Sequence, residues 1–163
     1  MKKAISIIAV FAVFLLSVSA HTERVFKAAD GFKAPMLKVV NDEMETSLDD
    51  LRGSYVLINF WASTDAVSRV AAGEYDAFMK SAAGKQIRLL SVNVDRNERL
   101  FKEIVRRDGL DEKTQYYVGD TDVKSIDNNY FSGVGLRSYL VNPQGDIVAT
   151  NPSTQTLASM MAI

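Results

Sequence analysis

The chain of 163 residues contains no cysteine. Without thiols it can form no disulfide, supply no thiolate nucleophile and hold no cysteine-ligated zinc or iron. Disulfide exchange is therefore excluded whatever the fold, and the stability of the domain has to come from its hydrophobic core.

Histidine is almost as scarce, because His21 is the only one. A single imidazole cannot build a zinc or iron site, and at this place it cannot serve as the base of a Ser/His/Asp triad. The acidic stretch "GDTDVKSID" offers Asp120, Asp122 and Asp127, but it lacks the glycine and the distal glutamate of a calcium loop. Capping and solvation explain these carboxylates better, so we expect no metal and no cofactor.

A basic surface is also missing, since 19 Lys and Arg residues face 20 Asp and Glu residues. This balance argues against a nucleic-acid partner, which would require a positively charged face.

The first 20 residues, "MKKAISIIAVFAVFLLSVSA", have the layout of a secretory signal peptide. Lys2 and Lys3 precede an apolar stretch, and small residues lead to Ala20. We predict a signal peptide over residues 1–20, cleaved after Ala20, and hence a periplasmic or extracellular protein with no membrane span after cleavage. Retention of the segment as an N-terminal anchor is the alternative.

The remaining chain predicts a flexible segment over residues 21–31 and one domain over residues 32–163. Its early part indicates a short strand in "PMLKVV", a turn over residues 41–45 and a helical turn capped by Ser47.

Two strand–helix units follow. The apolar run "YVLINFW", residues 55–61, is typical of a central strand buried on both faces. Residues 86–95 predict a second buried strand, before a helix that Asn97 caps and Gly109 ends. The helix between the two strands is predicted to end near Gly84. Its apolar positions recur at helical spacing, at Val67, Val70, Ala71, Tyr75, Phe78, Met79 and Ala82.

The last part of the chain indicates a β-hairpin, "RSYLVN" and "DIVATN", joined by the turn "NPQG". A short extended piece in "TQYYVG" and a helix over residues 120–130 precede it. A closing helix capped by Ser153 or Thr154 follows. Two parallel strands and an antiparallel pair predict a mixed sheet.

Two motifs carry a resemblance to a known family. "LDDLRGSYVLINFWAS" resembles the pattern L-x-D-L-x-G-K-x-V-L-x-N-F-W-A-S of secreted TlpA-like thiol–disulfide oxidoreductases, and "SYLVNPQGDIVA" resembles a later pattern of the same group. The resemblance covers residues 32–161. It implies an α/β, thioredoxin-like fold, with a central mixed β-sheet flanked by helices and a short N-terminal β extension.

The same resemblance implies a changed active site. The family continues with W-C-x-x-C-R, in which the first thiolate is stabilised at the N-terminus of a helix. Asp65 and Ser68 stand at the two cysteine positions here, and Leu136 stands where the family has a cis-proline. Neither Asp65 nor Ser68 can exchange disulfides, and a cis peptide before Leu136 would cost about 2.5–4 kcal/mol, so we expect a trans bond.

We therefore predict a non-catalytic module that binds a protein or peptide partner in the cell envelope. The expected binding groove comprises Trp61, Thr64, Asp65, Leu136 and Arg137. The alternatives are a structural or accessory subunit of a thiol–disulfide pathway, and an enzyme that works without cysteine.

Individual residues of this groove leave further alternatives. Asp65 is either a helix cap or a carboxylate that recognises a basic group, and its pKa should be low at a helix N-terminus. Arg137 either pairs with Asp65 or is solvated. Trp61 lies either at the surface or, as we expect for Phe60, in the core.

Overall fold

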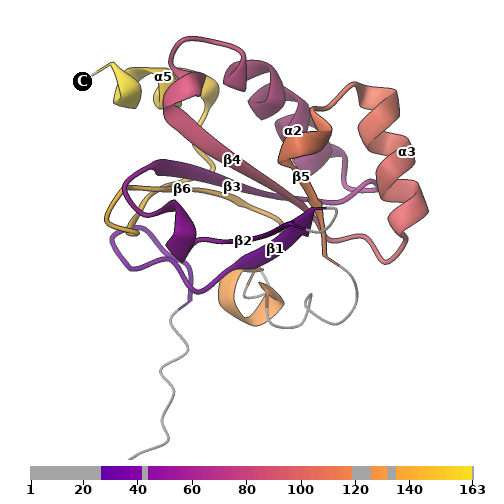
Figure 1. The fold of residues 1–163 in the computed structure, drawn as a ribbon, viewed down its shortest axis with the longest axis horizontal. Coiled ribbons are helices and arrows are strands. Elements are labelled where there is room, and N and C mark those ends of the chain that lie inside the picture. The colour runs from indigo at the N-terminus through magenta and orange to yellow at the C-terminus, as the bar shows by residue number, and fades with distance from the viewer. Residues whose placement is uncertain (1–26, 42–43, 119–125, 132–134, 163) are drawn as a thin grey trace, which may run out of the picture.

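The computed structural model describes residues 27–41, 44–118, 126–131 and 135–162. At its centre is a five-stranded sheet with the strand order β5-β4-β3-β6-β7, shown in Figure 1. Its strands are β3 Tyr55–Trp61, β4 Ile87–Asn93, β5 Gln115–Tyr117, β6 Ser138–Val141 and β7 Ile147–Thr150. Strands β3, β4 and β5 are parallel, whereas β6 is antiparallel to both β3 and β7. The predicted mixed sheet is confirmed.

A two-stranded antiparallel sheet precedes it, formed by β1 Lys38–Asn41 and β2 Met44–Ser47. The second strand replaces part of the turn that the sequence predicted. The 3-10 helix η1, Asp49–Leu51, follows, and Ser47 and Asp50 exchange hydrogen bonds at its start. Ser47 N donates to Asp50 Oδ2 at 3.0 Å and Asp50 N donates to Ser47 Oγ at 3.2 Å, a reciprocal cap of the kind expected at a helix start.

Three α-helices lie on one side of the sheet, and the β1–β2 hairpin lies on the other (Figure 1). They are α2 Ala66–Met79, α3 Glu98–Asp108 and α5 Thr154–Met161. Asn97 caps α3, Gly109 ends it with a left-handed φ of 67°, and Ser153 caps α5, as the sequence predicted. Helix α2 ends earlier than expected, because the chain turns after Met79 into the 3-10 helix η2, Gly84–Gln86.

The remaining helical segments are short. They are η3 Glu112–Thr114 and η4 Asp127–Phe131. Most of the helix predicted over residues 120–130 lies outside the described residues. Among the residues that are described, no helix is both long and apolar enough to cross a membrane.

The core on the hairpin side is hydrophobic and rich in aromatic rings. Alternate β3 residues point into it, among them Ile58 and Phe60, both 0% exposed. The Phe60 ring lies 5.0 Å from the rings of Tyr130 and Phe131. The prediction that Phe60 is a core residue is confirmed.

The helix-side core consists of separate clusters. Leu57 packs with residues of α2 and α5, including Tyr75 and Leu157. Trp61 packs with Ala72 of α2 and with the inner face of α3. The helices are thus held on the sheet at two apolar contacts rather than one.

Neighbouring segments cover both edge strands. Gly31 N donates to Ile147 O and Ile147 N donates to Phe32 O, each at 2.8 Å, along the outer side of β7. The Asn41 side chain donates to Gln115 O at 3.1 Å, on the outer side of β5. Ala28 N also donates to Asn129 O, so the described end of the segment predicted to be flexible is docked on the domain.

Candidate functional site

The candidate site lies where strand β3 passes into helix α2, between Trp61 and Ala66. Asp65 is the N-cap of α2, with extended backbone angles of φ −94° and ψ 104°. Its Oδ1 accepts a hydrogen bond from Ser68 N at 2.7 Å, which satisfies one of the free N–H groups of the first helical turn. The capping role that the sequence offered for Asp65 is confirmed.

Ser68 acts as a brace for the same junction. Its hydroxyl donates to Asp65 O at 3.2 Å and accepts from Ala62 N at 3.3 Å, and its residue is only 6% exposed. Both hydrogen-bonding roles of the hydroxyl are therefore used by backbone groups. The Asp65 carboxylate lies beside it, but the lowered pKa of Asp65 makes this carboxylate too weak a base to activate the hydroxyl, so Ser68 is not arranged as a nucleophile.

The carboxylate of Asp65 is exposed and more acidic than an ordinary aspartate. Hydrogen bonds from Ser68 hold the pKa of the Asp65 carboxyl below its ordinary value. This direction matches the expectation from the helix N-terminus, and it makes Asp65 a poor general base at neutral pH. Within the described residues, Asp65 Oδ2 has no hydrogen bond and the carboxylate has no basic partner.

A second carboxylate fixes the loop before Asp65. Ser63 N donates to both oxygens of Asp95 at 3.1 Å, and Ser63 Oγ donates to the same group. Asn93 Nδ2 donates to Asp95 Oδ2 at 3.0 Å, and Asp95 N donates back to Asn93 Oδ1 at 3.0 Å. The sequence interpretation missed this network. Polar residues at the carboxyl ends of two neighbouring parallel strands were the signal that could have revealed it.

Exposed aliphatic side chains follow Asp65 along α2. Val67 is 82% exposed and Val70 is 62% exposed, although the sequence interpretation placed both on the buried face. That interpretation was wrong because the buried face of α2 runs through Ser68, Ala72 and Tyr75, which turns Val67 and Val70 towards solvent. We call the exposed residues Thr64, Asp65, Val67 and Val70 the α2 surface.

Trp61 does not belong to this surface. Its side chain is 0% exposed and its ring lies 6.0 Å from the Phe101 ring of α3. The prediction that Trp61 lines a binding groove was therefore wrong. Side chains alternate along β3, so Trp61 points to the helix layer, where α3 covers it.

Leu136 and Arg137 precede β6 and lie beside the end of β3, since Phe60 N donates to Arg137 O at 3.1 Å. Leu136 is half-buried against the aromatic core on the hairpin side. No cis peptide bond occurs in the described residues, so the bond before Leu136 is trans as expected.

Arg137 makes no ion pair with Asp65 in the part of the chain that the structure describes. Burial raises the pKa of Tyr139, and the positive charge of the nearby Arg137 partly opposes this rise. The electrostatic effect of Arg137 is thus felt at Tyr139. The structure therefore brings Thr64 and Asp65 together but does not link them to Arg137.

An ion pair ties the first helical unit to the second. Arg69 Nε and Nη2 donate to the two oxygens of Asp108 at 2.6 and 2.7 Å. Both side chains are about a quarter exposed, at 28% and 25%. Arg69 occupies the place of the arginine in the W-C-x-x-C-R pattern, but nothing in the local sequence indicated its partner.

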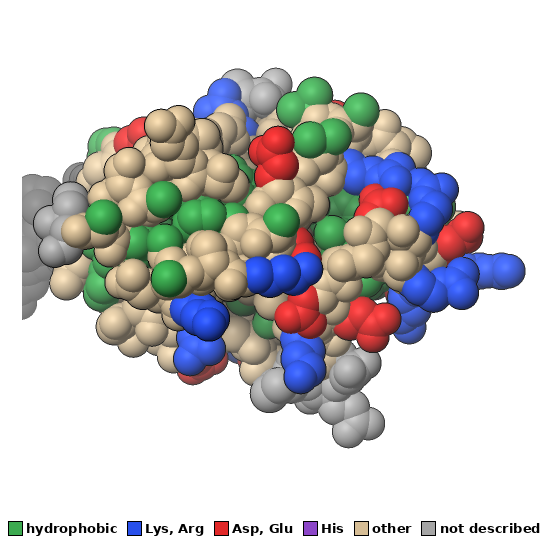
Figure 2. Space-filling view, turned by 90° about the horizontal axis from the view of Figure 1, so that it is seen from above, with side chains coloured by type: hydrophobic (Ala, Val, Ile, Leu, Met, Phe, Trp, Pro, Cys, Tyr) green, Lys and Arg blue, Asp and Glu red, His purple; other side chains and the backbone are tan. Residues whose placement is uncertain are grey.

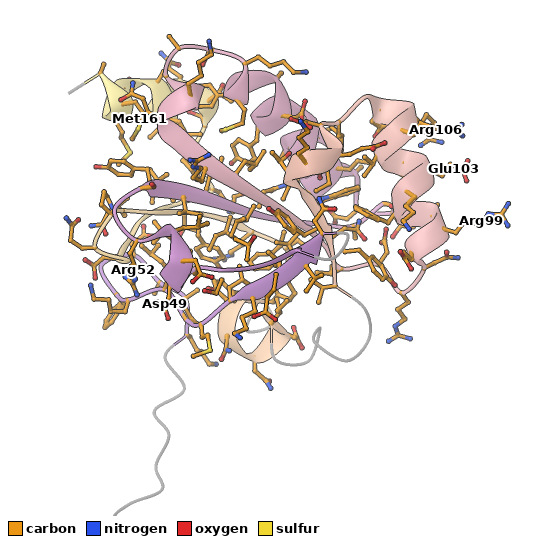
Figure 3. The ribbon with its side chains drawn as sticks, viewed as in Figure 1. Asp49, Arg52, Arg99, Glu103, Arg106 and Met161 are labelled. Carbon is orange, nitrogen blue, oxygen red and sulfur yellow. The ribbon has the colours of Figure 1, made fainter. Side chains whose placement is uncertain are left out.

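A separate cavity of about 1230 Å³ lies between α3, β5 and the β1–β2 hairpin. Its wall includes Asn41, Thr46, Phe101, Val105, Gln115 and Tyr116. Arg99, Glu103 and Arg106 also border it, but in Figure 3 their side chains point from α3 away from the sheet. Seen from above, basic side chains gather at this α3 end of the molecule (Figure 2).

No group of acidic or histidine side chains within the described ranges is placed to hold a metal ion. His21, Asp120 and Asp122, which the sequence analysis considered as ligands, lie outside those ranges.

No protein-family model and no curated protein sequence matches the chain. Solved structures do match. A thioredoxin-like protein from Parabacteroides distasonis is 27% identical, with a TM-score of 0.73, over 84% of this chain and 97% of that one. The thioredoxin domain of a thiol–disulfide oxidoreductase from Bacteroides vulgatus is 26% identical, with a TM-score of 0.68, over 83% and 97%.

A thiol:disulfide interchange protein from a Bacteroides species is 25% identical, with a TM-score of 0.67, over 82% of this chain and 88% of that one. These neighbours agree with the fold, with its mixed sheet flanked by helices and its small second sheet. The absence of cysteine is consistent with replacement of both residues of a C-x-x-C motif. The chain is thus a thioredoxin-like protein, similar to thiol–disulfide oxidoreductases, that has no dithiol.

Proposed function

We propose that the chain is an exported thioredoxin-like domain that works by binding a polypeptide at the α2 surface instead of by catalysis. The observation that carries the proposal is the exposure of Val67 and Val70, 82% and 62%, directly beside the Asp65 carboxylate. Solvent-facing helix positions are usually polar, and paired exposed aliphatic side chains are a feature of contact surfaces.

The chemistry of this surface suggests the kind of partner. The Asp65 carboxylate is ionised at neutral pH because its pKa is lowered, and one of its oxygens has no partner among the described residues. A partner with a Lys or Arg next to an apolar side chain would engage both Asp65 and the valines. The charge would give orientation, and the apolar contact would supply most of the affinity.

Affinity capture from a native envelope extract tests the binding role. We expect the wild-type domain to retain a partner that is lost from Asp65→Lys and from the double variant Val67→Ser, Val70→Ser. The matched control is Arg99→Ser with Glu103→Ser, which changes exposed positions of α3 and should leave capture intact. Equal capture by all variants would contradict the assignment of the surface.

The same material distinguishes the alternatives. A stable complex of fixed stoichiometry would favour a structural or accessory subunit over transient peptide binding. If the purified protein reduced the disulfides of insulin, the proposal that it has no oxidoreductase activity would be contradicted. Export is tested by fractionation of cells that express the full chain, with mass spectrometry expected to find His21 as the mature N-terminus.

A further inference from the structure

Four polar residues form a row across the sheet. Strand register places Ser91 beside Gln115 and also beside Asn59, and it places Asn59 beside Ser138. Neighbouring strands lie about 4.8 Å apart, so the four side chains emerge at one level on one face. All four residues are nearly inaccessible, with exposures between 0% and 4%.

This row separates the two apolar clusters on the helix side. Asn59 alternates along β3 with Leu57 of one cluster and Trp61 of the other. Helix α2 crosses above the row between Ala72 and Tyr75, which belong to different clusters. A polar layer with small members, two of them serines, therefore runs through an otherwise apolar interface.

Half of the side-chain polar atoms of the row have no protein partner in the described part of the chain. The buried side-chain atoms without a partner in the described part of the chain are Asn59 Nδ2, Ser91 Oγ, Gln115 Oε1 and Trp61 Nε1. Three of them belong to the row, and the fourth lies two residues further along β3. Buried polar atoms are rarely left unpaired, because they lose their hydrogen bonds to solvent.

The unpaired atoms are ordered as a chain of donors and acceptors. Ser138 Oγ donates to Asn59 Oδ1 at 2.9 Å, which leaves the Asn59 amide free to donate towards Ser91. Beyond Ser91, Gln115 Oε1 is free to accept. Gln115 Nε2 donates onward to Thr114 Oγ1 at 3.4 Å, and Thr114 donates to Asp111 O at 3.0 Å.

We propose that the row binds water on both sides of Ser91, one molecule between Asn59 and Ser91 and one between Ser91 and Gln115. Each water then has a donor on one side and an acceptor on the other, and every bond from Ser138 to Asp111 points the same way. Such alignment strengthens the individual bonds. Buried waters of this kind are integral parts of proteins and satisfy polar groups that have no other partner.

The outer end of the row meets the cavity beside β5, because Gln115 is one of the residues that line it. The proposal is independent of any binding at the α2 surface.

The direction in which Ser91→Ala changes the equilibrium constant for unfolding tests the proposal. In a hydrated row the Ser91 hydroxyl is satisfied, so its removal breaks the chain and raises the equilibrium constant for unfolding about 5-fold. In a dry row the same change removes an unsatisfied hydroxyl and lowers that constant. Urea unfolding followed by the fluorescence of Trp61, the only tryptophan, measures the constant.

The matched control is Ser138→Ala, which removes a hydrogen bond that the structure contains and should raise the constant in either case. Ser91→Ala acting in the same direction as Ser138→Ala supports the hydrated row, and the opposite direction overturns it. Oxygen-17 relaxation dispersion of the solvent provides a second readout. It should detect long-lived internal water that is reduced in Ser91→Ala, and an unchanged dispersion would also overturn the proposal.

Discussion

The two strand–helix units, β3–α2 and β4–α3, begin in the same way and present different surfaces. Each helix has a polar N-cap that accepts from the backbone three residues on, Asp65 from Ser68 at 2.7 Å and Asn97 from Leu100 at 3.1 Å. On α3 the outward positions are charged, as the side chains of Arg99 and Glu103 in Figure 3 illustrate.

On α2 the first outward positions are valines. A charged outer face is the ordinary solution for a solvated helix, and α3 adopts it. The outward positions of a helix in this layer can therefore be charged, and packing does not require valines there on α2. The proposed binding role of α2 rests on this difference.

The largest effect should come from Trp61, the residue through which the first unit rests on the second. Trp61→Ala should lower the free energy of unfolding by about 3–5 kcal/mol, because it leaves a large void next to Phe101. Val67→Ala is the control, since its exposed side chain contributes little. Similar losses in urea unfolding for both variants would contradict the burial of Trp61.

The two caps should be equivalent in stability but not in charge. Asp65→Ala and Asn97→Ala should each cost about 0.5–2 kcal/mol, through loss of a cap. Asp65→Asn should retain most of the capping. The pKa of Asp65 is lowered in the folded protein, so its contribution is present above the unfolded pKa and is lost as pH falls through the folded one. The difference in thermal stability between wild type and Asp65→Asn should therefore shrink as the pH is lowered through the pKa of Asp65 in the folded protein.

Helix α2 contains a glycine in its interior and α3 contains none. Gly73→Ala should raise the free energy of unfolding by about 1 kcal/mol, because an added Cβ meets no atom within 4 Å. Gly84→Ala is the contrasting variant. Its Cβ would collide with the backbone oxygen of Phe78, so the midpoint of urea unfolding should fall. A lower midpoint for Gly73→Ala would show that the bend or packing of α2 needs this glycine.

The smallest effect should come from the ion pair that joins the two helices. Arg69→Met should cost about 0.5–1 kcal/mol, because the pair is bidentate but partly exposed. The hydrogen bond from Arg69 lowers the pKa of Asp108, so the contribution is present above the unfolded pKa of this carboxyl and disappears as pH falls through the folded one. The difference between wild type and Arg69→Met in chemical unfolding should therefore vanish in acid. A difference that persists there would point to lost packing by the arginine stem.

The order of the elements could be predicted from the sequence because each one has a local signal. The apolar run of β3, the caps Asn97 and Ser153 and the turn that ends at Gly145 all act within a few residues. The end of α2 was misplaced, since the chain turns after Met79 through contacts that have no local pattern.

The site was predicted only where its chemistry is local. Asp65 caps the helix that begins at the next residue and accepts a hydrogen bond from Ser68 N, three residues ahead, which a local pattern can reveal. The exposure of Val67 depends on which face α2 turns to the sheet, and the burial of Trp61 depends on its packing against α2 and α3. The partners Asp95 and Asp108 come from other strand–helix units, so the local sequence gave no means of pairing them with Ser63 and Arg69.

The contacts that cover the two edge strands protect the molecule from its own copies. Gly31 and Phe32 form backbone hydrogen bonds with Ile147 of β7, and the Asn41 side chain donates to a carbonyl of β5. An open edge would offer those groups to a strand of another chain and lead to intermolecular sheets and aggregation. The segment before β1 and the β1–β2 hairpin thus leave fewer backbone groups of β7 and β5 open to pairing with another copy.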